Sequence, residues 1–353
     1  MCSLLSPIAE TGSYPKFLEL RRGKNQKMQE TLSMITLDEI KKAANRIRGY
    51  AFRTPLYRTF SEENVFLKLE CFQPVRSFKI RGASNKILSL PEKKRKEKGV
   101  ITASSGNHGL AVAYVANKIG IKATIVLPEN VVKDKLDMIQ SLGAQTVLFG
   151  RQQDERVKKA DEIQKKEDQI FVQAFNDLEI IAGQGTCGLE IAEDGSNLES
   201  IFVPIGGGGL ISGIAAAIKL NERTKKVKVI GVQPDGSPSM YDSWRKGAVT
   251  SIESSKTIAD GLSVRKPGDI TFAFVKNFVD EIILVSDDEI LSATYKLLRK
   301  EHILAEPSGA AAFAGLLKSR SVGREKAVST AVVSGGNISQ EVLARILESP
   351  VSA

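Results

Sequence analysis

The stretch Ser77-Phe78-Lys79-Ile80-Arg81-Gly82-Ala83 holds a lysine between an aromatic and a β-branched residue. It follows a break at Pro74-Val75 and precedes a segment, 82–90, that we expect to be helical. A lysine in such a position is most often a solvated surface charge, and taken alone this one is better explained that way. Three turns found elsewhere in the chain favour a functional role for Lys79 instead.

Three glycine- and serine-rich turns each follow a strand-like segment and precede a helix-like one. They are Ser104-Ser105-Gly106-Asn107-His108-Gly109, Gly206-Gly207-Gly208-Gly209 and Ser334-Gly335-Gly336-Asn337. Such turns present main-chain N–H groups to an anion, and the four glycines let a phosphate approach the backbone closely. No Lys-Ser/Thr pair follows the glycines, and Gln233 stands where a dinucleotide site would have an acid. A small phosphate ester therefore fits better than a nucleotide.

The other two turns offer polar side chains. Ser104 to Asn107 suits a substrate carboxylate or a ring oxygen, although simple capping of the next helix is also possible. Ser334 offers a neutral hydroxyl at the end of a strand. A phosphate cradle, carboxylate donors and one lysine together describe a pyridoxal 5′-phosphate site, in which the lysine holds the aldehyde as a Schiff base.

Strand-like and helix-like segments alternate along the chain, which predicts an α/β fold with parallel sheets flanked by helices. The expected strands are 65–69, 100–102, 123–127, 146–149, 201–205, 227–233, 282–285 and 329–333. The expected helices are 37–48, 82–90, 109–118, 132–142, 153–166, 210–220, 287–300 and 339–347. Sites in such folds lie at the carboxyl ends of the strands.

Composition excludes several other classes of function. The net charge of +9 comes from lysines and arginines interleaved with acids, as over 92–98, without the aromatic residues of a stacking platform, so we expect no nucleic-acid partner. Two histidines and three scattered cysteines argue against a metal site and a disulfide framework, and favour a reducing, cytoplasmic location. No apolar run suggests a membrane span. Residues 1–35 lack periodicity and are expected to be a loose extension.

With these motifs the chain resembles the fold-type II (tryptophan synthase β-like) pyridoxal-phosphate enzymes, and within them the threonine dehydratase and serine racemase branch. The resemblance implies a two-lobed enzyme. Its large cofactor-binding domain would comprise residues 36–98 and 177–353, and its small mobile domain residues 99–176. The motifs that carry it, in the family's order between about residues 36 and 340, are 73–83, 104–109, 181–186, 206–209, 258–261 and 334–337.

The resemblance also implies a role for each matching residue. Lys79 would carry the cofactor and act as the base at the substrate Cα, and Phe78 would pack against the cofactor ring. The cofactor phosphate would be held by Gly206, Gly207, Gly208 and Gly209, the ring oxygen by Asn107 and the pyridine nitrogen by Ser334. The substrate would be bound by Ser104, Asn107, His108 and Phe175.

Two features bear on the choice between dehydratase and racemase. Ser105 stands where racemases of this branch have the acid/base group opposite the lysine, so racemisation is chemically available. Against it, Gln233 and Ser239 stand where racemases have acidic ligands of a divalent metal, and neutral oxygens bind hard cations poorly. We therefore expect no metal. The usual His-Pro before Phe175 is replaced by Gln173-Ala174, which leaves the choice among threonine, serine and hydroxyaspartate open.

The sequence thus predicts a cytoplasmic threonine/serine dehydratase (ammonia-lyase) that uses pyridoxal phosphate and a small amino-acid substrate. By likeness to the family we expect a homodimer or a dimer of dimers. The chain ends soon after the third turn, so we expect no regulatory domain and no inhibition by isoleucine through one. A serine racemase with side dehydratase activity is the alternative, and a catalytically silent binding relative is disfavoured because Lys79, Ser334 and the four glycines are intact.

Overall fold

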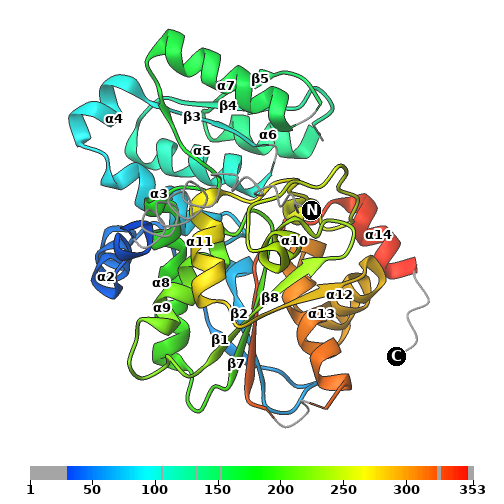
Figure 1. Ribbon diagram of the computed structural model, residues 1–353. Coiled ribbons are helices and arrows are strands. Elements are labelled where there is room, and N and C mark those ends of the chain that lie inside the picture. The colour runs from blue at the N-terminus through cyan, green and yellow to red at the C-terminus, as the bar shows by residue number, and fades with distance from the viewer. Residues whose placement is uncertain (1–29, 105, 132, 152, 324–326, 349–353) are drawn as a thin grey trace, which may run out of the picture.

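The computed structural model describes residues 30–104, 106–131, 133–151, 153–323 and 327–348, which form two sheets flanked by helices (Figure 1). The larger sheet has six strands in the order β1-β2-β10-β7-β8-β9. Its strands are β1 Leu56–Arg58, β2 Val65–Leu69, β7 Ser200–Pro204, β8 Lys228–Pro234, β9 Glu281–Val285 and β10 Ser329–Val333. The strands are parallel except for β1, which pairs with β2 in the antiparallel sense.

The smaller sheet has four parallel strands in the order β5-β4-β3-β6 and is formed entirely by residues 100–171. Its strands are β3 Val100–Ala103, β4 Ala123–Leu127, β5 Gln145–Leu148 and β6 Ile170–Phe171. In Figure 1 this sheet and its helices α5, α6 and α7 lie at the top, above the part of the chain that carries the larger sheet. The chain thus crosses between the two sheets at β3 and again after β6.

Helices cover both sheets. Those before and within the smaller-sheet region are α2 Leu37–Arg46, α3 Lys79–Ser89, α4 Glu92–Lys98, α5 Asn107–Ile119, α6 Lys133–Ser141 and α7 Gln153–Glu167. Those that follow are α8 Leu178–Asp194, α9 Gly209–Lys219, α10 Ser239–Lys246, α11 Asp269–Phe278, α12 Asp287–Lys300, α13 Pro307–Ser321 and α14 Gln340–Glu348. Of two short 3-10 turns, η1 Glu70–Phe72 lies between β2 and α3, and η2 Asp260–Leu262 lies between α10 and α11.

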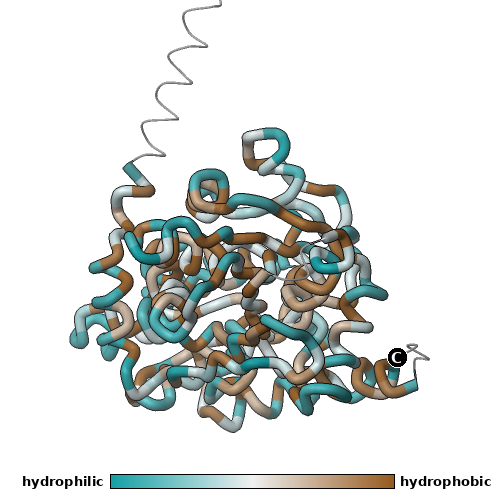
Figure 2. Tube along the Cα trace, turned by 90° about the horizontal axis from the view of Figure 1, so that it is seen from below, coloured by the Kyte–Doolittle hydropathy of each residue, from teal (hydrophilic) through white to brown (hydrophobic). Residues whose placement is uncertain are grey.

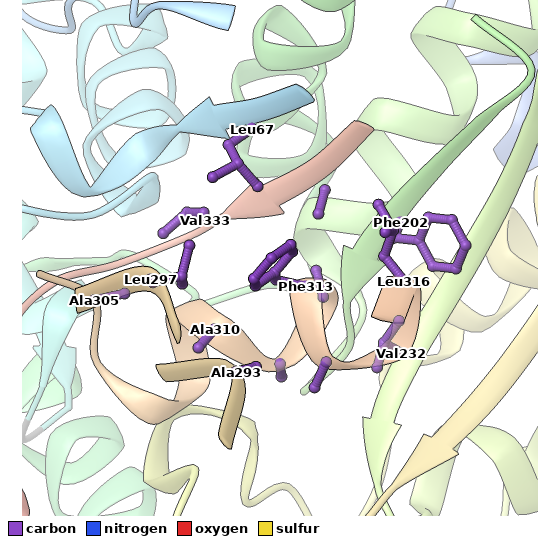
Figure 3. Packing of buried hydrophobic residues seen from close by; sticks show 14 of the residues in the cluster. Leu67, Phe202, Val232, Ala293, Leu297, Ala305, Ala310, Phe313, Leu316 and Val333 are labelled. Atoms are coloured by element: carbon purple, nitrogen blue, oxygen red, sulfur yellow. The ribbon is translucent and has the colours of Figure 1, made fainter. Parts of the chain in front are cut away.

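Hydrophobic segments run through the interior, whereas hydrophilic segments are common on the outer turns (Figure 2). The largest cluster of buried apolar residues lies between the six-stranded sheet and α13. Phe313 of α13 is fully buried there, on the side of the helix that faces Leu67 and Val333 of the sheet (Figure 3). Burying a side chain of this size stabilises the fold by about 1.5–3 kcal/mol.

The helix α8 packs closely against α3 because glycines remove the side chains between them. A Cβ atom on Gly183 of α8 would lie 2.7 Å from the Cα atom of Gly82 in α3. A Cβ atom on Gly82 would in turn lie 2.5 Å from Nε2 of Gln184. Gly82 therefore sits inside a helix, where its cost in helix propensity is offset by close helix packing.

All of the expected strands and helices are present, with ends within a few residues of those predicted. Two helices begin two or three residues earlier than predicted: α3 starts at Lys79 instead of residue 82, and α5 at Asn107 instead of residue 109. The sequence did not predict β1, β6, α4, α8, α10, α11 or α13. Of the expected N-terminal extension the structure describes residues 30–35, where Ile35 is buried and Leu32 packs against the same cluster.

Within the described ranges, no helix is long and apolar enough to cross a membrane.

Candidate active site

The lysine stretch is tied to the turn that follows β10. Ser77 forms an isolated antiparallel bridge with Gly335, the main-chain N–H of Phe78 donates to Ser334 O at 3.1 Å, and that of Gly336 donates to Arg76 O at 2.8 Å. These bonds fix the backbone just before α3. Lys79 is consequently the first residue of a helix that starts beside Ser334.

The amino group of Lys79 lies in a poorly solvated position. Its Nζ donates to Ala174 O at 2.9 Å and lies 5.2 Å from the centre of the Phe78 ring. Burial disfavours the charged form and lowers the pKa of Lys79 to about 8. Among the described residues, none contributes a charge that opposes this lowering of the Lys79 pKa. Lys79 therefore loses its proton at lower pH than an ordinary lysine does, and the free amine is the form that attacks an aldehyde.

A buried network of charges holds α3 behind Lys79. Arg81 is 1% exposed and donates to both carboxylate oxygens of Glu70, at 2.7 and 2.8 Å, and to both of Glu190, at 2.7 and 2.8 Å. Lys68 adds a bond to Glu190 at 2.6 Å. Since Glu70 belongs to η1 and Glu190 to α8, the network joins three elements around the first turn of α3.

The glycine turn after β7 forms a cradle without side chains. Gly208 has a φ of +92°, in the left-handed region, and a Cβ atom there would lie 2.6 Å from Cε of Met240. A Cβ atom on Gly207 would clash with the ring of Phe175, and one on Gly206 would lie 3.0 Å from Gly261 O. Thr271 Oγ1 donates to Gly207 O at 2.7 Å and fixes the loop from outside. The N-terminus of α9 begins at Gly209, so the loop and helix fit a phosphate group.

The remaining predicted residues have distinct environments. Ser334 is 4% exposed, and its hydroxyl donates to Ser308 O at 3.3 Å. Ser104 lies at the end of β3, where its Oγ accepts from the main-chain N–H of Gly106 at 3.4 Å. Ser105 lies outside the described residues.

His108 is turned into the protein interior. Its Nε2 lies 3.0 Å from Val172 O, and its side chain is buried. Burial, together with the charge of Lys79, lowers the pKa of His108 to about 3, so the imidazole is neutral and donates to this carbonyl. What His108 can offer a substrate carboxylate is therefore its main-chain N–H in the first turn of α5.

Phe175 and Asn176 join the segment after β6 to the glycine turn. The Phe175 ring covers Gly207, and its Cβ would lie 3.0 Å from a Cβ on Gly209. Asn176 Oδ1 accepts the main-chain N–H of Ile270 at 3.0 Å. The same segment supplies Ala174 O to Lys79, so it touches the lysine and the cradle together.

Asn107 joins the turns after β3 and β10. Its Oδ1 accepts from Asn337 Nδ2 at 2.7 Å, and its own Nδ2 donates to Oε1 of Glu306 at 2.6 Å. Glu306 was missed by the sequence analysis, as was Thr271. Glu306 stands immediately before Pro307-Ser308-Gly309. Because proline is common at the first position of a helix, this stretch could have predicted that Glu306 lies at the start of a helix.

Gln233 and Ser239, which stand where a metal site was considered, are bonded to the main chain. Gln233 Oε1 accepts the N–H of Tyr241 at 2.9 Å, and Ser239 Oγ donates to Val264 O at 2.5 Å. In the part of the chain that the structure describes, no group of three or more His, Cys, Asp and Glu residues could hold a metal ion.

Comparison with known proteins finds matching enzymes over most of the chain. An L-threonine ammonia-lyase of Thermotoga maritima is 45% identical over 320 residues, which cover 89% of this chain and 78% of the relative. The catabolic L-threonine dehydratase TdcB of Escherichia coli K12 is 39% identical over 312 residues, which cover 86% of this chain and 93% of that protein.

Solved structures agree with these relatives. Maize serine racemase superposes with a TM-score of 0.83 at 33% identity, covering 88% of this chain and 96% of the racemase. The processed form of threonine deaminase isoform 2 from Solanum lycopersicum has a TM-score of 0.82 at 33% identity, covering 88% and 93% respectively. A family model described as pyridoxal-phosphate dependent enzyme matches residues 47–335. The predicted fold and cofactor are thereby confirmed, and the chain belongs to the family of pyridoxal-phosphate dependent enzymes.

Proposed function

We propose that the protein is a threonine/serine dehydratase (ammonia-lyase) that eliminates water from L-threonine or L-serine to give a 2-oxo acid and ammonia. The observation that carries the proposal is the weakly basic Lys79 amine beside the cradle covered by Phe175, with a neutral Ser334 rather than a carboxylate on the neighbouring turn. The L-threonine ammonia-lyase and L-threonine dehydratase relatives support the same activity.

Bound pyridoxal phosphate supplies an electron sink that acidifies the substrate Cα–H bond. Gly206 to Gly209 would bind its phosphate through main-chain N–H groups at the start of α9. With a pKa of about 8, Lys79 can accept the Cα proton near neutral pH when it is released from the cofactor. Ser334, whose hydroxyl donates to Ser308 O, would hold the pyridine nitrogen through that hydroxyl without adding charge to the site.

The turn after β3 would bind the substrate carboxylate. Ser104 and Asn107 offer side-chain groups, and the first N–H groups of α5 point out of the helix start, where a negative charge is stabilised. Phe175 would line the end of the pocket that receives the substrate side chain. It would therefore influence the preference between threonine, which has a methyl group on Cβ, and serine, which has a hydrogen there.

We also propose that residues 99–176 move as a small domain that closes over the substrate and excludes water. Several polar contacts reach from that segment to the rest of the chain near the site, and two of them involve a charged side chain at the edge of α5 or α6. Asn107 donates to Glu306 at 2.6 Å, and Lys135 Nζ lies 3.4 Å from Oδ2 of Asp260. Both contacts would have to be made and broken as the domain moves.

The product assay tests the activity directly. Purified protein loaded with pyridoxal phosphate should release 2-oxobutanoate from L-threonine and pyruvate from L-serine. The variant Lys79→Ala should release neither, and it should also lose the visible absorption band of a lysine-linked cofactor. A wild-type protein that binds the cofactor yet converts neither amino acid would refute the proposed function.

Serine racemase is the second candidate, because maize serine racemase superposes with a TM-score of 0.83 and the resemblance to the racemase branch implies an acid/base role for Ser105. Formation of D-serine faster than pyruvate would favour this candidate. We propose that no divalent metal is involved, since Gln233 and Ser239 are neutral and bonded to the main chain. Loss of activity with a chelator and its recovery with magnesium would contradict that.

We further propose a cytoplasmic protein that assembles as a homodimer or a dimer of dimers. The exposed side chains of Phe52, Phe60 and Phe72, which are 56%, 88% and 45% exposed, support an interface. Light scattering after size exclusion measures the mass of the assembly. A single species of 38.3 kDa would contradict this proposal.

A further inference from the structure

Glu306 is a buried carboxyl group next to the candidate active site. It precedes α13 in an extended conformation, with φ −77° and ψ 159°, and its side chain does not cap that helix. Its side chain is 6% exposed, and its main-chain N–H donates to Gly335 O at 3.1 Å. A Cβ atom on Gly335 would overlap Oε1 of Glu306, so the absence of a side chain at residue 335 makes room for this carboxyl group.

The carboxyl group of Glu306 terminates a chain of hydrogen bonds. Asn337 Nδ2 donates to Val75 O at 2.9 Å and to Asn107 Oδ1 at 2.7 Å, and Asn107 Nδ2 donates to Glu306 Oε1 at 2.6 Å. A carboxylate only accepts hydrogen bonds, so Asn107 must turn its amide nitrogen towards Glu306 and its oxygen towards Asn337. Each bond in such a chain strengthens the next.

We propose that Glu306 is a positioning residue whose carboxylate fixes the orientation of the Asn107 amide, and with it the contact that Asn107 makes with the ring oxygen of the cofactor. The inference rests on the proposed function through that role of Asn107. Glu306 itself does not need to touch the substrate or the cofactor.

The charges around Glu306 make this orientation depend on pH. Burial and the nearby Asp260 of η2 raise the pKa of Glu306 to about 7, while the bond from Asn107 and the charge of Lys135 in α6 oppose the rise. The neutral Cys71 thiol of η1 also lies close enough to interact. Above pH 7 the carboxylate accepts from Asn107 Nδ2. Below pH 7 Glu306 carries a proton, and it can instead donate to Asn107 Oδ1 if the amide turns round.

The substitution Glu306→Gln keeps the shape of the side chain and removes the charge. We expect the cofactor-free protein to bind pyridoxal phosphate about three- to tenfold more weakly, as for the exchange of a charge-assisted hydrogen bond for a neutral one that no longer fixes which way the Asn107 amide points. We also expect the bound cofactor, without substrate, to lose the change of its visible spectrum with pH near neutrality. Glu301→Gln is the matched control, because Glu301 is similarly buried at 5% exposed but accepts from the main chain of Phe60 and Ser61.

A double-mutant cycle separates positioning from general stability. If Glu306 acts through Asn107, then Glu306→Gln should have no further effect on cofactor affinity when it is added to Asn107→Ala. Additive effects would overturn the proposal. So would equal losses of cofactor affinity in Glu306→Gln and Glu301→Gln. The shorter carboxylate of Glu306→Asp should keep the spectral change with pH, and its disappearance in that variant would also count against the proposal.

The wild-type protein provides a test that does not depend on folding of a variant. In the ¹⁵N spectrum of the cofactor-free protein, the side-chain NH2 resonance of Asn107 should shift as the pH passes through about 7. A resonance that does not move between acid and alkaline pH would overturn the proposal. These measurements use no substrate, so they stay informative even if neither threonine nor serine is converted.

Discussion

Replacing Arg81 by methionine would remove the cation from the buried network behind Lys79. The substitution keeps much of the length and apolar volume of the side chain but leaves Glu70, which is 0% exposed, without its main partner. Lys68 still reaches Glu190 at 2.6 Å, so the second carboxylate keeps one partner. Breaking a buried ion pair by removing one member costs about 3–5 kcal/mol, and we expect a loss of that size in the free energy of unfolding at neutral pH.

The loss should depend on pH in a definite direction. Burial is the largest influence on the pKa of Glu70 and would raise it, but the charge and hydrogen bonds of Arg81, together with Lys68 and Thr54, hold that pKa below its usual value. In the wild type this group stabilises the fold above the unfolded pKa of about 4.3, and the stabilisation is lost as the pH falls. In Arg81→Met the pKa of the buried carboxyl group is raised instead, so its protonated form is favoured. The difference between the two proteins should therefore grow as the pH rises.

Urea unfolding of both cofactor-free proteins at about pH 5 and about pH 8 measures this difference. Arg53→Met is the matched control, because Arg53 also bonds two carboxylates, Glu193 at 2.8 Å and Asp194 at 2.5 Å, but at the exposed surface. We expect the control to lose less than about 1 kcal/mol. A similar small loss in Arg81→Met, or a loss that shrinks as the pH rises, would refute the reasoning.

Three further predictions concern the site. Because the pKa of Lys79 is about 8, the rate at which cofactor-free protein forms the visible cofactor band should rise with pH and reach half its maximum near pH 8; a rate that rises only above pH 10.5 would contradict this. Gly208→Ala forces a side chain onto a φ of +92° and against Met240, so pyridoxal phosphate should bind about five- to 150-fold more weakly, as follows from a strain of about 1–3 kcal/mol; Gly247→Ala, at φ +70° with open space around it, is the control. His108 has a folded pKa of about 3, below its unfolded value of about 6.5, so its contribution to stability is complete above pH 6.5 and is lost as the pH falls; His108→Gln should flatten that part of the acid unfolding curve, and an unchanged curve would show that another group is responsible.

The fold could be predicted from sequence where a local pattern and the tertiary structure agree. Strand β10 is a short apolar run between polar residues, and α12 has a capping box of Ser286 and Glu289, which is present in the structure. The helices α8 and α13 were missed because they carry many glycines and alanines and are buried on most sides. Such helices lack the alternation of polar and apolar faces that reveals a surface helix.

Some residues of the candidate site could likewise be predicted from sequence, and others could not. Lys79 and the glycine turn could be singled out because their chemistry depends on residue types at adjacent positions. Glu306 lies far from Asn107 in the chain, and only the fold brings the two together. The sequence likewise did not reveal that the imidazole of His108 faces Val172 rather than solvent, because burial of a side chain depends on packing between elements.

The position of β10 in the large sheet has a consequence for the synthesis of the protein. Residues 329–333 pair with 65–69 on one side and with 200–202 on the other, so this late segment of the chain forms the middle of the sheet. Until the ribosome has delivered it, β2 and β7 each present an open edge of unpaired main-chain groups. Open edges of this kind pair readily with other chains. The yield of folded protein in a cell should therefore depend on how long those two edges stay exposed during translation.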